Sequence, residues 1–524
     1  MSSRLIVFYS ITIFLLSSIY FMYNKAMMFD QFQHYYDMKY YNNGKIPYVG
    51  ARLLATPTID EASTTPRIPG GIYYILYKFF FNIAQENFIN TKIINYIFNV
   101  LIIFIFLFWV YKRFNILVFH FLMMILLINP FLISSIIDFW NPNYTLIFSF
   151  IFLILLYEYI ASYSIVYVKI SAILLFPILA IMSQTHINSF LFLVPTLILY
   201  FIIDIKKTKI YINYILLGIL LSFILYSPYF ISEISNNFYN TKLILTTSHS
   251  LKRLDFPPIH SLIIFPTNEM SIMYGGRLSS IIKFWFSDYV NSFIFIFLII
   301  NLLFSIFCFF TSVFYTFKYY SLNSIEEINL INIMKFLFLF LFINIFILIL
   351  LNIKSGPLYY LNSIFSFSFI PIIFVFTKYY NFINSNKLLK NILYIYFIFN
   401  MLAASFQMFK YYNNYERPYN IKNMELLFSK LHCESTNNNN IKIVNIYIGE
   451  HKNQYRDISR FFYTNFPINE DDNSTNIYFL FDKLNSYNYK DSYKYNDILL
   501  SNSVCIFSNN RLYLYKYTNN NFIF

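Results

Sequence analysis

The sequence predicts an α-helical polytopic membrane protein of about eleven transmembrane helices, followed by a small extracytoplasmic α/β domain. The composition is the first indication, because 58% of the 524 residues are hydrophobic and only 12% are charged. Soluble chains carry about 25% charged residues. A series of long apolar stretches over residues 1–409 is the second indication, and the mixed strand and helix pattern of the tail is the third.

Each predicted transmembrane helix corresponds to an apolar stretch long enough to cross a hydrocarbon core of about 30 Å. The stretch 5–23 is longer than the apolar part of a signal peptide, and no small-residue cleavage site follows it. We therefore interpret it as an uncleaved transmembrane helix. The predicted spans are 5–23, 92–111, 115–136, 144–161, 167–183, 187–203, 211–229, 289–316, 336–352, 359–377 and 391–409.

The basic residues predict the orientation of these spans. With a cytoplasmic N-terminus, the basic short loops fall on the cytoplasmic side, as positive-inside topology requires, and Lys354 is the exception. The loops 24–91 and 230–288 and the tail are then extracytoplasmic. Short basic loops also account for much of the net charge of +13, so we expect the lipid bilayer and no nucleic acid as a partner.

The tail, residues 410–524, is expected to fold as a separate α/β accessory domain beside a transmembrane catalytic domain of residues 1–409. Runs rich in β-formers, such as "IKIVNIYIG" and "RLYLYKY", alternate there with helix-compatible segments such as "MELLFSKL". Cys433 and Cys505 lie in this region. An oxidising compartment would permit a disulfide between them, and the sequence leaves this pairing open.

The loop after the first span holds the most informative motif. Asp30, His34 and Asp37 are spaced by four and three residues, so a helix would place them on one face. The loop continues through "NNGKIPYVG" to "TTPRIPGGIYYILYKFF", and later loops carry "DFWNPN" and "SQTHINSF". In these features about the first 210 residues resemble the GT-C class of polytopic glycosyltransferases. Relatives in that class include protein O-mannosyltransferases and lipid A aminoarabinose transferases.

The resemblance implies an inverting enzyme of the cell membrane that moves a sugar from a polyprenyl phosphate to an acceptor hydroxyl on the outer face. A glycolipid, a polysaccharide or a protein of the cell envelope would serve as acceptor. The resemblance also implies that segments 29–43 and 70–84 form short helices on the outer surface, beside Asp138 and His186.

Asp30 is the expected catalytic base, because transfer to a hydroxyl needs a carboxylate that accepts the acceptor's proton. The family often has Glu at the next position, whereas this chain has Gln31. Either the second acid is dispensable, or Asp60, Glu61 or Asp138 takes its role. Asp138 is the further catalytic candidate, because an ionisable group at the membrane boundary is costly unless it faces a polar cavity or a partner.

The other polar candidates would bind substrate, and cations among them would neutralise the departing phosphate. They are His34, Asp37, Arg52, Asp60, Glu61, Arg67, His186, Arg253 and Arg277. No cofactor is certain. A divalent metal is compatible, with Glu61 and His186 as candidate ligands, although the sequence has no ligand motif of fixed spacing. Each of these side chains also fits the ordinary interpretation of a solvated or interfacial residue.

Two other classes of protein fit the composition. A surface-polysaccharide polymerase or ligase also has many spans and a large outer loop, but it normally places its chemistry in a later loop. A lipid or solute transporter would carry charges or Gly/Pro breaks near the midplane of its spans, and mid-span charge is nearly absent here. The glycosyltransferase is therefore the preferred interpretation.

Overall fold

The computed structural model divides into two compact units. The first contains Met1–Ile19 and Met38–Met408, and the second contains Tyr20–Asp37 and Phe409–Phe524. The structure describes residues 3–26, 30–31, 34–35, 37–38, 46–53, 65–161, 164–246, 259–269, 282, 285–286, 292–318, 324–351, 358–413, 420–437, 442–446, 477–482, 503–508 and 512–517. The roles predicted for residues 1–409 and 410–524 remain predictions.

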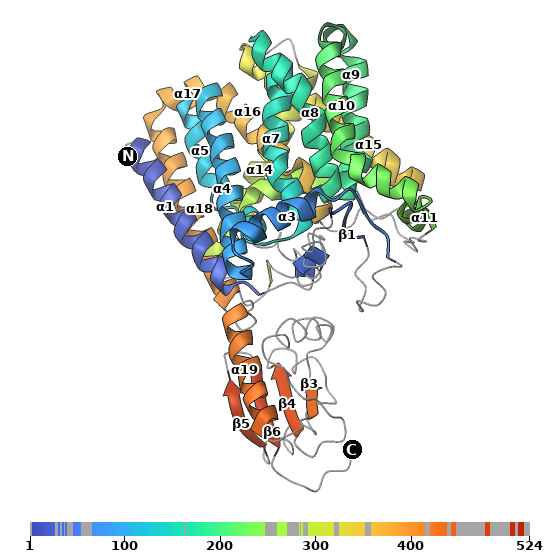
Figure 1. Cartoon of the computed structure of the whole chain (residues 1–524). Helices are drawn as coiled ribbons and strands as arrows, with labels where there is room; N and C mark the ends of the chain where they lie inside the picture. The colour runs from blue at the N-terminus through green and yellow to red at the C-terminus, as the bar shows by residue number, and fades with distance from the viewer. Residues whose placement is uncertain are drawn as a thin grey trace. The chain divides into compact units, whose positions relative to one another are not determined.

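Eight helices of the described residues are long and apolar enough to cross a membrane. They are α1 (Ser3–Asn24), α4 (Phe88–Arg113), α7 (Asn141–Ala161), α8 (Ile165–Thr185), α10 (Ile205–Ser235), α14 (Ser292–Phe317), α15 (Ile325–Leu351) and α18 (Lys387–Tyr411). Helices α4, α7 and α8 pack side by side (Figure 1). The chain is thus a multi-pass α-helical membrane protein, as the composition predicts.

The predicted span 115–136 is a broken helix. It consists of α5 (Ile116–Leu126) and α6 (Pro130–Ile136), which meet at 68° and would make a ninth span if counted together. The break lies at Asn129, whose side-chain oxygen accepts a hydrogen bond from the Leu132 N–H at 3.0 Å and caps α6. Pro130 then begins α6, because a proline has no N–H to continue the preceding helix but fits a first helical turn.

Two other predicted spans contain shorter apolar helices than a straight crossing helix. The described residues thus contain eight or nine long apolar helices, and the number of about eleven spans stays a prediction. Segment 187–203 forms the π-helical turn η2 (Ser189–Leu193) and α9 (Val194–Ile203). Segment 359–377 forms the 3-10 turns η6 (Leu358–Ile364) and η7 (Ser366–Phe369), followed by α16 (Ile370–Lys378). Both α9 and α16 have a proline within their first two positions, which favours a new helix start there.

The first unit also contains short elements between the spans. They are α3 (Ile72–Ile83), α11 (Tyr239–Thr246), α12 (Ile259–Ile264), the 3-10 turn η3 (Phe265–Thr267) and α17 (Tyr380–Ser385). Helix α3 buries three tyrosines and two phenylalanines on one side and exposes Ile75, Phe79 and Ile83 on the other, the pattern of a helix with one face against the protein. The helix predicted at 70–84 is therefore confirmed. Helices α3 and α11 lie at the same end of the bundle as β1 (Figure 1).

A two-stranded antiparallel sheet precedes α3. It is formed by β1 (Val49–Arg52) and β2 (Arg67–Pro69), and β1 bulges between its two paired positions. Gly70 follows with a φ of +97°, and a Cβ atom at this position would lie 2.4 Å from the side chain of Gln184. Glycine is required here both for the left-handed backbone and for the close approach to the end of α8.

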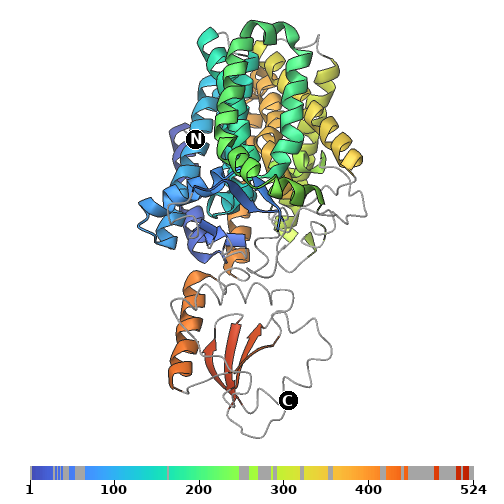
Figure 2. The same ribbon diagram turned by 45° about the vertical axis from the view of Figure 1, so that its right-hand side comes forward.

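The second unit contains α19 (Ile421–Asn437) and a four-stranded sheet. The strands are β3 (Lys442–Ile446), β4 (Ile477–Asp482), β5 (Ser503–Ser508) and β6 (Leu512–Tyr517), in the order β3-β4-β6-β5. Strands β3 and β4 are parallel and the other pairs antiparallel. Lys516 Nζ lies 3.0 Å from a carboxylate oxygen of Glu434, which joins β6 to α19. Helix α19 lies alongside the sheet (Figure 2). The small α/β fold predicted for the tail is confirmed, and Cys433 and Cys505 are free, exposed thiols.

Candidate functional site

The structure separates the predicted site residues into three groups. Asp60, Glu61, Arg253 and Arg277 lie outside the described residues. The second unit holds Asp30, His34 and Asp37, and the first unit holds Arg52, Arg67, Asp138 and His186.

The described parts of the predicted helix 29–43 are helical, namely 30–31, 34–35 and 37–38. A shared face for Asp30, His34 and Asp37 also depends on residues 32–33 and 36, which lie outside the described residues, so it stays a prediction. His34 is buried, whereas both aspartates are half-buried. Gln31, at the position where the family often has Glu, is fully buried, so this position presents no polar group to solvent.

Arg52 and Arg67 are directly opposite each other in the β1–β2 pair. The neighbouring Leu53 N–H donates to the Pro66 carbonyl at 2.8 Å, so Arg52 and Arg67 form the non-hydrogen-bonded type of pair. In that type the side chains project from one face with Cβ atoms about 4.5–5.5 Å apart. Two like charges in this position repel each other. The hairpin thus starts two half-buried arginine side chains from neighbouring positions on one face.

Arg67 is held against its own hairpin. Its Nη1 atom donates to the carbonyl oxygen of Gly50 at 3.3 Å. A Cβ atom on Gly50 would lie 3.0 Å from the Gly70 carbonyl and 3.2 Å from the Gln184 carbonyl, so the small residue lets the two strands and the end of α8 meet closely. The arrangement is suited to an anion, because guanidinium groups bind phosphate oxygens through paired charge-assisted hydrogen bonds.

Gln184 ties the hairpin region to the membrane helices, and sequence reasoning did not single it out. Its side-chain oxygen accepts from the Ile72 N–H at 3.2 Å, and its Nε2 donates to the Leu225 carbonyl at 3.2 Å. One buried amide therefore links the start of α3, the end of α8 and the middle of α10. The signal available in the sequence was its place within "SQTHINSF", beside His186.

Asp138 is paired with a lysine that sequence reasoning counted only as the first residue of a span. Lys92 Nζ lies 3.7 Å from Asp138 Oδ1, and the two side chains are 3% and 1% exposed. Asn95 Nδ2 donates to the Asp138 carbonyl at 3.4 Å, and the Tyr144 hydroxyl donates to Asn95 Oδ1 at 2.7 Å. Tyr77 of α3 stacks on Phe139 at 4.1 Å. The carboxylate is thus buried beside Lys92 of α4, and the residue after it packs against α3.

His186 lies just past the end of α8 and is 8% exposed. Its Nδ1 accepts the Asn188 N–H at 3.3 Å, and its ring centre lies 5.3 Å from that of Tyr360. Burial lowers the pKa of His186 to about 4, so the imidazole is neutral near pH 7. A neutral imidazole is the form that accepts a proton or binds a metal. In the part of the chain that the structure describes, no three His, Cys, Asp or Glu side chains come together as metal ligands.

Two buried acids near the second long loop were missed by sequence reasoning. Glu233, in the last turn of α10, is 4% exposed, and Glu269 is 2% exposed. Trp285 Nε1 donates to Glu269 Oε2 at 3.1 Å. Glu233 lies just after the predicted span 211–229, and an ionisable residue at such a border was the available signal. Glu269 lies inside the predicted loop 230–288 and had no such signal.

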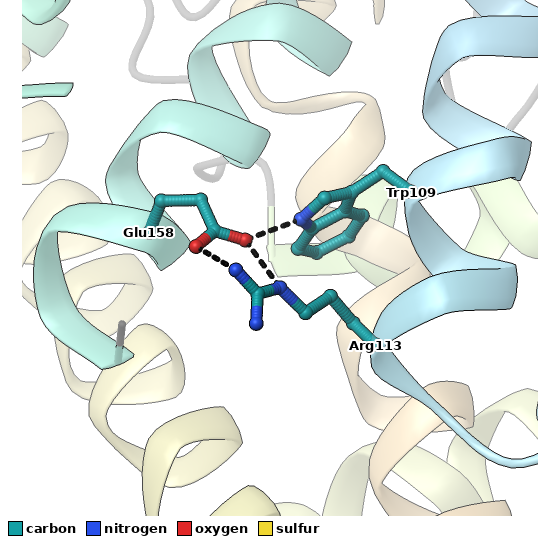
Figure 3. Close-up of polar contacts among 3 residues, drawn as sticks. All are labelled: Trp109, Arg113 and Glu158. Carbon is teal, nitrogen blue, oxygen red and sulfur yellow. Dashed lines mark hydrogen bonds and ion pairs between the residues drawn. The ribbon is translucent and has the colours of Figure 1, made fainter. Parts of the chain in front are cut away.

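A second charged cluster ties the opposite ends of the same helices. Arg113 Nε and Trp109 Nε1 donate to one oxygen of Glu158 at 2.6 Å and 2.7 Å, and Arg113 Nη2 donates to the other (Figure 3). Lys92 and Arg113 lie near the two ends of α4, and Asp138 and Glu158 near the two ends of α7. Helices α4 and α7 therefore run parallel with an ion pair at each end. We assign the Glu158 cluster a structural role, because its hydrogen bonds join α4 to α7.

No family model matches the chain, and no curated protein matches it. Among solved structures, the chain is similar to ArnT from Cupriavidus metallidurans in the apo state, with a TM-score of 0.46 and 8% identity over 97% of each chain. It is also similar to ArnT from the same organism bound to undecaprenyl phosphate, with a TM-score of 0.45 and 9% identity over 98% of this chain and 97% of the other. Similarity at this level leaves the activity open.

Proposed function

We propose that this chain is a GT-C-like membrane glycosyltransferase that moves a sugar from a polyprenyl phosphate to an acceptor hydroxyl. The acceptor is a glycolipid, a polysaccharide or a protein on the outer face of the cell membrane. The observation that carries the proposal is the pairing of Arg52 with Arg67 on the hairpin before α3. A chain with only 12% charged residues places two arginines opposite each other on this hairpin, and guanidinium groups bind phosphate oxygens through charge-assisted hydrogen bonds.

The proposed reaction is a single inverting displacement. The bond between the sugar carbon and the phosphate oxygen breaks while the bond to the acceptor oxygen forms, and the polyprenyl phosphate leaves with the electron pair. A carboxylate accepts the proton of the acceptor hydroxyl, a contribution worth about 10²–10⁴-fold, and Asp30 is the candidate that the sequence predicts for it. Arg52 and Arg67 stabilise the charge on the departing phosphate. His34 and Asp37, which the sequence predicts to share a helix face with Asp30, orient the acceptor.

Asp138 receives a different role from the catalytic one predicted from the sequence. Its carboxylate is 1% exposed and faces Lys92, so it is not accessible to a substrate in this structure. We assign it a positioning role beside Lys92 of α4. The domain of residues 410–524 is proposed to bind the acceptor and to supply no catalytic group, because binding energy gathered away from the reacting centre can orient a substrate there.

A binding experiment with undecaprenyl phosphate as the probe tests the proposed phosphate site. Purified wild-type protein and the Arg52→Ala, Arg67→Ala and doubly substituted variants are titrated with the lipid in detergent. Arg4→Ala is the matched control, because Arg4 is exposed near the start of α1. Each single loss of a charge-assisted hydrogen bond costs about 1.5–3 kcal/mol, so Kd should rise roughly tenfold or more.

The same proteins give a second readout, because a ligand that binds only the folded state raises its unfolding temperature. The lipid should raise the unfolding temperature of the wild type and of Arg4→Ala, and should have little effect on the doubly substituted variant. Equal Kd values for all four proteins and Arg4→Ala would reject the phosphate site. If the wild type and all variants bind the lipid with equal affinity, and the wild type transports the lipid across a bilayer, the transporter class would be favoured instead.

A further inference from the structure

Asn240 contacts both main-chain groups of Arg67. The Arg67 N–H donates to Asn240 Oδ1 at 2.8 Å, and Asn240 Nδ2 donates to the Arg67 carbonyl at 3.0 Å. These two groups point away from β1, as the main-chain groups of a non-hydrogen-bonded pair must. The Asn240 amide therefore occupies the place of a third strand at the edge of β2. A two-stranded sheet is marginally stable alone, so this contact sets where Arg67 can lie.

Asn240 is itself fixed by a buried carboxylate. Glu233 Oε1 accepts the Asn240 N–H at 3.2 Å, and Glu233 Oε2 accepts the Thr241 N–H at 2.8 Å and the Thr241 hydroxyl at 2.5 Å. Asn240 Nδ2 also lies 3.3 Å from the Tyr229 hydroxyl. Glu233 and Asn240 are 4% and 8% exposed. A carboxylate on the first N–H groups of α11 satisfies donors that the helix cannot use and favours its start.

The corner between α10 and α11, residues 236–238, has a strained backbone and places Asn240 against β2. Asn237 and Phe238 have φ values of +54° and +57°. The left-handed region is unfavourable for a bulky side chain such as phenylalanine and persists where the surroundings determine the backbone. Here the Phe238 N–H donates to the Glu233 carbonyl at 2.7 Å. The corner brings Asn240 back against β2 instead of letting the chain continue along α10.

We infer that Asn240, held by Glu233, is a positioning residue that aligns the Arg67 guanidinium for phosphate. The inference rests on the proposed function, because Arg67 must bind the phosphate for its alignment to matter. Arg67 is fixed through its backbone on one side by Asn240 and faces Arg52 on the other. Loss of the amide leaves the charge of Arg67 in the protein but lets its backbone move.

A double-mutant cycle separates this role from a structural one. Undecaprenyl phosphate is titrated against the wild type, Asn240→Ala, Arg67→Ala and the double variant. Asn240→Ala should raise Kd about tenfold in the wild-type background and leave it unchanged in the Arg67→Ala background, because coupled residues are not additive. Asn236→Ala is the control. Asn236 is exposed on the same corner, and its side chain bonds only within α10, to Ser232.

Asn240→Asp is the second variant, because it keeps the size of the side chain and the acceptor for the Arg67 N–H but loses the donor for the Arg67 carbonyl. It should raise Kd in the same direction by a smaller factor. The inference is overturned if Arg67→Ala weakens binding while Asn240→Ala and Asn240→Asp bind like the wild type. It is also overturned if the two substitutions act additively. If Arg67→Ala itself leaves Kd unchanged, the proposed function fails at this site before Asn240 is considered.

Discussion

The ammonium group of Lys92 lies 3.7 Å from the carboxylate of Asp138, and neither side chain is more than 3% exposed. Two charges in a protein interior stabilise each other only as a pair, because each alone pays a large desolvation cost. The pair joins the start of α4 to the turn before α7, and the neighbouring Phe139 stacks on Tyr77 of α3.

Removal of one partner of this pair should destabilise the protein. Lys92→Met leaves the Asp138 carboxylate buried without its opposite charge, which typically costs about 3–5 kcal/mol. The double variant Lys92→Met/Asp138→Leu should recover most of that loss. Thermal unfolding in detergent measures both, with Lys335→Met, an exposed lysine of α15, as the control. A double variant that is stable but inactive in transfer would return Asp138 to the catalytic role predicted from the sequence.

Asp30→Asn should abolish transfer while leaving expression and unfolding temperature unchanged. The amide has the size of the carboxylate but cannot accept the proton of the acceptor, so the rate should fall at least 10²-fold. Transfer in membranes containing equal amounts of protein is the measurement, and Glu326→Gln, an exposed acid of α15, is the control. Retention of more than roughly a tenth of wild-type activity would exclude Asp30 as the base.

Acid should destabilise the wild type through His186. The pKa of this group is lowered by burial from 6.5 to about 4, so the unfolded chain binds more protons between these values. The contribution to stability is complete above pH 6.5 and is lost as the pH falls towards 4, by about 3 kcal/mol at most. Unfolding temperature between pH 7 and 4 should fall more steeply for the wild type than for His186→Gln. His432→Gln, at a half-exposed histidine, should follow the wild type, and parallel curves for all three would refute the assignment.

The tail should lie outside the cytoplasm. The prediction depends on an odd number of membrane crossings. Nine or eleven crossings place the tail on the side opposite the N-terminus, whereas eight place both on the same side. A reporter that is active only outside the cytoplasm should therefore be active when fused after Lys410 and inactive when fused after Lys206. Activity of a cytoplasmic reporter at Lys410 would show that the bent pair α5–α6 does not cross.

The positions of the membrane helices could be predicted from the lengths of the apolar stretches in the sequence. All eleven predicted apolar stretches contain helix in the described residues, because about 20 apolar residues are needed to cross a bilayer whatever their order. The predicted stretches are irregular where a proline or a capping residue such as Asn129 divides them. Apolar length contains no information on such breaks, and local capping chemistry decides them.

The candidate site was predictable as a set of residue types but not as a set of contacts. Arg52 and Arg67 were both candidates, yet their pairing depends on the register of β1 and β2 and on a bulge. In the sequence, Lys92 looks like an ordinary first residue of a span, and only the structure shows Asp138 beside it. Asn240 carries no pattern of its own, because its role comes from two hydrogen bonds to the backbone of Arg67.

The most direct test of the central claim is a comparison of envelope lipids and glycans in a deletion strain complemented with wild-type protein or with Asp30→Asn. A transferase that uses a polyprenyl phosphate consumes a lipid-linked sugar and adds that sugar to one acceptor. The account predicts that the Asp30→Asn strain accumulates a polyprenyl-phosphate-linked sugar and lacks the same sugar on one glycolipid, polysaccharide or protein. Identical lipid-linked sugars and identical envelope glycans in the two strains, with equal amounts of the two proteins in the membrane, would contradict it.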